Sequence, residues 1–242
     1  MDFSQDDLFD AIDAAVRDVL DRSGAMGPAV DALELAQTLF RIPVQMAEPE
    51  EEEPRRYGDA PRRRPPPDTI VLKMEQSEET HQALAARALA RRLVPGILAK
   101  LGIVPGTEHR GAEKPLIATI LPRLLLPTRR FATEARKAGY DLFALKAIFG
   151  TASFETIAWR LLDVDDEASV VAIVDDGSVT ARRGNRFPVT KALTEAESEA
   201  VRRAAATKDP ARTRRDDWTA TAWPVSGIPF RRIIVRAVPD GI

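Results

Sequence analysis

The residue types that carry most protein chemistry are scarce in this chain. It has no cysteine, so it can form no disulfide, no thiolate zinc cluster and no cysteine nucleophile. Its two histidines are His81 and His109. Zinc hydrolases usually take at least two of three protein ligands from histidine. A zinc centre of that kind would therefore need both of them.

Motifs for other common reactions are absent from the sequence. No Gly-x-Ser-x-Gly elbow marks a serine nucleophile, and no glycine-rich loop marks a phosphate site. Paired carboxylates occur at Asp165-Asp166 and Asp175-Asp176. Adjacent acids point in different directions on a strand and are common in turns. We therefore expect no general acid/base catalysis by these pairs, and no cofactor.

The composition is that of an ordinary globular chain. Its 242 residues suffice for one large domain or two smaller ones, and 44% hydrophobic residues argue against wholesale disorder. The 35 basic and 37 acidic residues give a net charge of −2, which provides no global attraction for nucleic acid or an acidic membrane. An acidic amino terminus and the lack of a long apolar stretch predict a cytoplasmic protein without a signal sequence or membrane span.

Two helices are expected at the start of the chain. Apolar residues form one stripe along 7–20, which is typical of a helix packed on a core. Asp31 is placed to cap a second helix that runs to about Phe40, with Glu34 answering it as in a capping box. An acidic run and a basic, proline-rich run then predict an exposed or disordered insertion at 47–68.

A strand and a helix are expected to follow this insertion. Ile70-Val71-Leu72 has the character of a short strand, and Ser77 is a good N-cap for a helix that reaches about Leu93. The apolar stretch 116–126 is interrupted by Pro122, so a kinked helix is expected there.

The segment 141–162 has a helix-turn-helix pattern. Asp141 and Ser153 are placed to cap its two helices, and Gly150 interrupts the chain between them. The second helix is apolar and has few of the polar side chains that contact bases. The favoured interpretation is therefore that this helix packs into the core.

The carboxy-terminal third changes to short apolar runs. Strands are expected at 170–174, 219–223 and 233–238, with a helix at 195–206. The pattern predicts an α+β fold in two domains. These are a mostly helical domain with a short sheet over 1–166 and a small α+β domain over 167–242.

Several segments resemble the ImmA/IrrE family of bacterial metallopeptidases. Leu124-Leu125-Leu126-Pro127 is similar to the family's segment ending in Leu-Leu-Met-Pro, and Ala158-Trp159-Arg160-Leu161 is similar to the Ala-x-Arg-Leu ending of its paired helices. The run 27–36 and Arg41-Ile42-Pro43-Val44 look like its amino-terminal helical unit. The resemblance covers residues 8 to 166 and implies a zincin-like peptidase domain, followed by a sensor-like domain.

The zinc motif of that family is replaced in this chain. The family uses a helical His-Glu-x-x-His, whose residues four apart hold one zinc ion while the glutamate activates water. The matching positions here are Arg87, Ala88 and Arg91. Arginine offers no lone pair, and two guanidinium groups would repel a dication. The family's third ligand would fall at 114–116, which leaves Glu113 as the nearest acid.

Two alternatives concern the residues at and near this helix. A displaced metal site would have to use His81, His109 and Glu113, whereas the simpler interpretation makes both histidines ordinary polar residues. Arg87 and Arg91 would either bind an anionic peptide or phosphate through fork-like hydrogen bonds or form a solvated helix face.

The leading functional prediction is a catalytically inactive, metallopeptidase-like regulatory protein. It would bind a protein partner such as a transcriptional repressor, in stress response or transcriptional regulation, and no membrane. The alternatives are an active zinc metallopeptidase with relocated ligands, and a DNA-binding regulator that uses the helix-turn-helix at 141–162.

Overall fold

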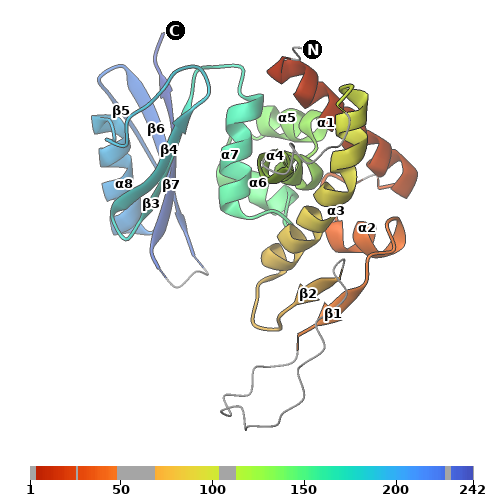
Figure 1. Ribbon diagram of the computed structural model, residues 1–242. Helices are drawn as coiled ribbons and strands as arrows, with labels where there is room; N and C mark the ends of the chain where they lie inside the picture. The colour runs from red at the N-terminus through yellow and green to blue at the C-terminus, as the bar shows by residue number, and fades with distance from the viewer. Residues whose placement is uncertain (1–3, 26, 48–68, 104–112, 227–229, 242) are drawn as a thin grey trace, which may run out of the picture. The chain divides into compact units, whose positions relative to one another are not determined.

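The protein has the α+β fold expected from its sequence (Figure 1). The computed structural model describes residues 4–25, 27–47, 69–103, 113–226 and 230–241. Of the segment 47–68 expected as an insertion, only Ala47 is among the described residues. Within the described part, no helix combines the length and apolarity needed to cross a bilayer.

The chain forms two compact units that meet in sequence between Pro127 and Thr128. This boundary comes earlier than the one expected at residue 166. The reason is that a helix ending near that residue packs against the carboxy-terminal sheet and so belongs with it. The helix-turn-helix segment therefore lies in the second unit.

The first unit is built around one long helix. This is α3 (Glu78–Lys100), and three helices contact it: α1 (Gln5–Ser23), α2 (Ala32–Thr38) and α4 (Glu113–Leu125). Two short strands, β1 (Val44–Met46) and β2 (Ile70–Leu72), pair in parallel, and β2 contacts α3.

The cap of α2 differs in one respect from the expected capping box. Asp31 accepts a hydrogen bond from the Glu34 amide at 2.9 Å, as predicted. In place of a returning bond to Glu34, the buried side-chain amide of Gln82 on α3 accepts from the Ala32 backbone amide at 2.7 Å and donates to Asp31 at 3.0 Å. A contact between residues so far apart in the chain has no local sequence signal.

Helix α3 continues beyond its predicted end at Leu93. It passes through Pro95, whose ring removes one helical hydrogen bond. Val94 and Ile97 are buried on either side of this proline, and α3 packs along α4. Tertiary packing therefore sustains the helix where local propensity would end it.

A buried arginine joins α4 to α1. The Arg123 guanidinium carbon lies 4.2 Å from the centre of the Phe9 ring, and its Nε lies 3.5 Å from an Asp13 carboxylate oxygen. A cation placed on a ring face and beside an acid is compensated for its loss of water.

The second unit begins with three helices. These are α5 (Thr128–Lys137), α6 (Leu142–Ile148) and α7 (Phe154–Val164). Asp141 and Ser153 cap α6 and α7 as predicted, since their side chains accept hydrogen bonds from the amides of Ala144 and Thr156. Helix α5 was not expected, because its polar sequence buries only Phe131 and Ala135.

A five-stranded antiparallel sheet in the order β4-β3-β7-β6-β5 follows the helices. The strands are β3 (Val170–Asp175), β4 (Ser178–Gly184), β5 (Ala211–Arg215), β6 (Trp218–Val225) and β7 (Arg232–Pro239). The three central strands match the predicted runs. The two edge strands were not predicted, because their charged sequences hide the alternation that a half-buried strand shows.

Helices cover both faces of this sheet (Figure 1). On one face lies α8 (Glu195–Thr207), whose buried Ala196, Ala200 and Ala204 pack against small side chains of the strands. On the other face α7 contacts β3 and β7. Residues that alternate along a strand therefore belong either to the α8 side or to the α7 side.

Candidate functional site

The strand expected at 70–72 and the helix expected to follow Ser77 are both present. Strand β2 leads into α3, and the Ser77 hydroxyl accepts a hydrogen bond from the Thr80 amide at the start of the helix. Glu78 and Glu79 occupy its first turn, where negative charge favours the positive end of the helix dipole. Arg87, Ala88 and Arg91 therefore lie in the middle of a well-formed helix.

The rotation of α3 places Arg87 and Arg91 on its surface. Leu89 and Ala90 are fully buried, whereas Arg87 and Arg91 are exposed and Ala88 is half-buried. Residues four apart lie on one face, so the two guanidinium groups are neighbours. Neither forms an ion pair or hydrogen bond with any residue that the structure describes. Within the described part of the chain, this face of α3 therefore presents two positive charges without an ion-pair partner.

The other metal-site candidates do not converge on α3. Glu113 is exposed at the first residue of α4, and the nearby position 116, where the family's third ligand could fall, holds a buried leucine. His81 places Nε2 2.9 Å from the Lys73 carbonyl oxygen, a contact that spans the turn between β2 and α3. His109 lies outside the described residues. Among the described residues, no three His, Asp or Glu side chains are grouped so as to share a metal ion.

The helix-turn-helix at 141–162 offers little surface for reading DNA. Of the eleven residues of α7, only Asp163 is exposed. Arg160 is 1% exposed, and it pairs with Asp163 at 2.6 Å and donates to the Thr128 hydroxyl. A recognition helix needs a face of free polar side chains. The expectation that this second helix packs into a core is confirmed.

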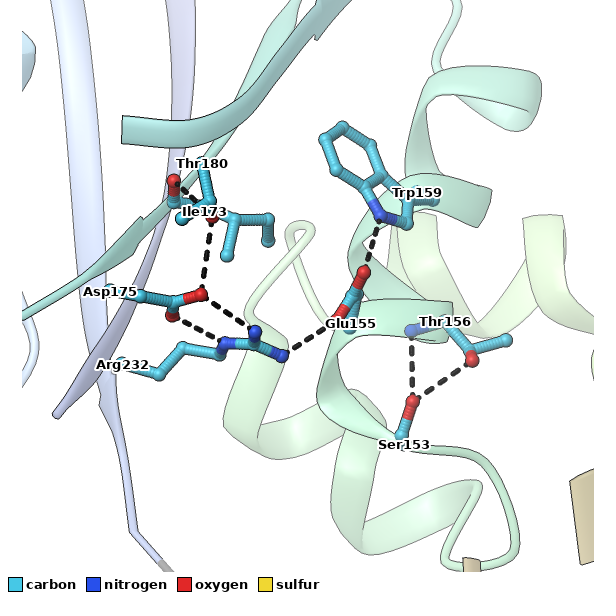
Figure 2. A network of polar contacts seen from close by, with 8 residues as sticks. All are labelled: Ser153, Glu155, Thr156, Trp159, Ile173, Asp175, Thr180 and Arg232. Carbon is cyan, nitrogen blue, oxygen red and sulfur yellow. Dashed lines mark hydrogen bonds and ion pairs between the residues drawn. The ribbon is translucent and has the colours of Figure 1, made fainter. Parts of the chain in front are cut away.

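A polar network that the sequence did not reveal fixes the start of α7 to the sheet (Figure 2). Arg232 on β7 donates through Nε and Nη2 to the two Asp175 oxygens, at 2.7 and 2.8 Å. Its Nη1 donates to Glu155 on α7 at 2.6 Å, and the other oxygen of Glu155 accepts from the Trp159 indole at 3.3 Å. One guanidinium thus joins β3, β7 and α7.

A second arginine of β7 fixes the opposite end of α7. Arg236 donates through Nε and Nη2 to Asp165, at 3.0 and 2.5 Å, and the Asp165 side chain is fully buried. Its guanidinium carbon also lies 4.5 Å from the centre of the Tyr140 ring. The sequence identifies Asp165 only as one of two adjacent acids of the kind that is common in turns. In the structure it is the C-cap residue of α7.

The spacing of these two arginines matches the length of the helix that they hold. Four strand residues advance about 13 Å, and the ten helical steps from Glu155 to Asp165 advance about 15 Å. Arg232, Ile234 and Arg236 also alternate on one face of a central strand. Charged residues at alternate positions of a buried strand require acidic partners, and this is the sequence signal that could have revealed the network.

Hydrogen bonds from Arg232 lower the pKa of the Asp175 carboxyl below its ordinary value, against the opposing effect of burial. The Arg232 charge and a hydrogen bond from the Thr180 hydroxyl act in the same direction. The carboxylate form of Asp175 is therefore favoured by the folded state. The geometry of the network is that of a structural clamp, since every charged group in it has a partner.

Comparison with known proteins supports the fold and leaves the activity open. No protein-family model matches the chain, and no curated protein sequence matches it. Among solved structures, it is similar to a Mycobacterium tuberculosis transcriptional regulator, with a TM-score of 0.64 and 20% sequence identity. The similarity covers 96% of this chain and 76% of that chain. At this identity the likeness establishes a shared α+β fold.

Replacing Arg232 by alanine is expected to lower the free energy of unfolding of the second unit by about 2 kcal/mol, because Asp175 and Glu155 lose their common partner. Chemical denaturation followed by tryptophan fluorescence measures the change. The control is Arg214→Ala, which removes an exposed ion pair with Asp240 and should cost less than about 1 kcal/mol. Equal losses in the two variants would contradict a clamp at Arg232.

The effect of Asp175→Asn should depend on pH. Because the folded-state pKa of Asp175 is lowered, its contribution to stability is present above its unfolded value of about 3.9 and is lost as pH falls through the folded value. The difference in unfolding free energy between wild type and Asp175→Asn should therefore be large at neutral pH and shrink below about pH 4. A difference that is constant across this range would show that the carboxylate charge is irrelevant.

Proposed function

We propose that this protein is a catalytically inactive relative of the ImmA/IrrE metallopeptidases that regulates a partner protein by binding it. The observation that carries the proposal is the identity and placement of Arg87, Ala88 and Arg91. They occupy the three working positions of the family's zinc motif, on a helix that follows a strand, with the two arginines on its surface. The scaffold for the motif is kept, while the groups that would bind zinc and activate water are replaced.

The chemistry of this helix face suggests the kind of partner. Two exposed guanidinium groups four residues apart can each form paired hydrogen bonds to a carboxylate, and both are free of partners among the described residues. An acidic segment of a partner protein would supply such carboxylates. The regulator described above supports the same role, because its likeness extends over nearly the whole chain. A transcriptional repressor is accordingly our candidate partner.

The similarity to a transcriptional regulator fits a DNA partner as well as a protein partner, but the two alternative functions meet obstacles at their candidate residues. A relocated zinc site would have to recruit His81, whose Nε2 already contacts the Lys73 carbonyl, and Glu113, which is exposed on α4. A DNA-binding role for 141–162 would have to use α7, whose residues are buried or half-buried apart from Asp163. The regulatory proposal requires neither rearrangement.

The proposal is tested with the full chain and the transcriptional repressor encoded nearest to its gene. Binding measured by calorimetry should be saturable, and the repressor should stay intact in the presence of zinc. The double substitution Arg87→Glu/Arg91→Glu should weaken binding by tenfold or more, since each lost charge-assisted contact contributes on the order of 1.5–3 kcal/mol. The control Arg17→Glu/Arg22→Glu reverses two exposed charges on α1 and should leave binding unchanged.

Two results would overturn the proposal. Cleavage of the repressor that a chelator abolishes would show an active metallopeptidase. Equal weakening of binding in both double variants would show that net charge, rather than the α3 face, determines the interaction.

A further inference from the structure

Three arginines and a threonine gather on the α7 side of the sheet, towards its β5 edge. Arg212 on β5 lies opposite Thr221 on β6, which lies opposite Arg236 on β7. Residues directly opposed across antiparallel strands share a face, with Cβ atoms about 5 Å apart. Arg214 follows two residues after Arg212, so it projects from the same face roughly 7 Å away. We call Arg212, Arg214, Thr221 and Arg236 the basic row.

Nearby acids neutralise two of the three arginines in the basic row. Arg236 is held by Asp165, and the Nε of Arg214 donates to Asp240 at 2.6 Å. Hydrogen bonds from Thr219 and Arg214, with the added charge of Arg212, lower the pKa of the Asp240 carboxyl. Arg212 itself forms no ion pair or hydrogen bond with the residues that the structure describes. Three arginines against two acids leave the row with one net positive charge among the described residues.

Unused hydrogen-bond donors accompany this charge. Arg214 and Arg236 have Nη groups that take no part in their contacts with Asp240 and Asp165, and the Thr221 hydroxyl has no partner among the described residues. Exposure increases along the row, from the half-buried Arg236 and Thr221 to the exposed Arg212. The donors thus run from the covered centre of the sheet to its open edge.

Protection of an open sheet edge accounts for only part of this arrangement. Charged side chains on an edge strand discourage pairing with another chain, and Arg212, Arg214 and Arg215 all serve that purpose on β5. It does not explain why an unpaired hydroxyl and a further arginine continue the same row onto β6 and β7. Hydrogen-bond donors that lie on the same face of three neighbouring strands could bind the several oxygens of one polyatomic anion.

We propose that the basic row binds the phosphate group of a small phosphorylated molecule. A phosphate offers three or four oxygens in different directions, so it can accept from several guanidinium groups and from a hydroxyl together. A planar carboxylate has two oxygens and would use fewer of these donors. The site belongs to the second unit alone and is separate from the arginines of α3.

The proposal is tested by calorimetric titration of the full chain with inorganic phosphate and with phosphoserine, at constant ionic strength, and with acetate as the carboxylate comparison. Saturable binding of both phosphates is expected, and weaker binding of acetate. Arg212→Ala should weaken phosphate binding about tenfold, as loss of one charge-assisted donor implies. Arg212→Lys, which keeps the charge but loses the fork, should fall between wild type and Arg212→Ala.

The matched control is Arg215→Ala. Arg215 is exposed on the same strand, but it alternates with Arg214 and so projects from the α8 side of the sheet. This variant changes the net charge equally and should bind phosphate as wild type does. The proposal is overturned if Arg212→Ala and Arg215→Ala weaken binding equally, if acetate binds as well as phosphate, or if phosphate shows no saturable binding at millimolar concentration.

Discussion

A guanidinium group has no lone pair to give to a metal ion, and this constraint determines what α3 can do. Its buried Leu89 and Ala90 set the rotation of the helix, so the side chains at 87 and 91 must reach the surface together. With histidine at both positions that surface could hold zinc, whereas with arginine it holds two positive charges. This face of α3 therefore lacks zinc ligands and instead offers charged hydrogen-bond donors.

Arginine also holds the second unit together. Arg232 and Arg236 attach the two ends of α7 to β7 through Glu155 and Asp165, so the helix cannot shift along the sheet without breaking an ion pair. Removal of one member of such a pair leaves a poorly solvated charge without a partner, which is costly. Positions of α7 that keep both pairs are therefore favoured over positions that break one. Arg87, Arg91 and Arg212 differ from these, because no acid among the described residues forms an ion pair with them.

Local sequence signals predicted the elements that depend on local physics. The caps at Asp31, Ser77, Asp141 and Ser153 and the three central strands are where they were expected. Contacts between distant residues could not be predicted in this way, as with Gln82 at the cap of α2 and the continuation of α3 past Pro95. The charged edge strands were missed because edge protection replaces the apolar alternation that identifies a strand.

The central claim is that α3 carries no zinc site, and elemental analysis of the purified full chain tests it most directly. After dialysis against a zinc-containing buffer and then a metal-free one, the chain should retain far less than one zinc ion per molecule, and His81→Ala should not change that content. Retention of close to one zinc ion per chain, lost in His81→Ala or Glu113→Ala, would contradict the account.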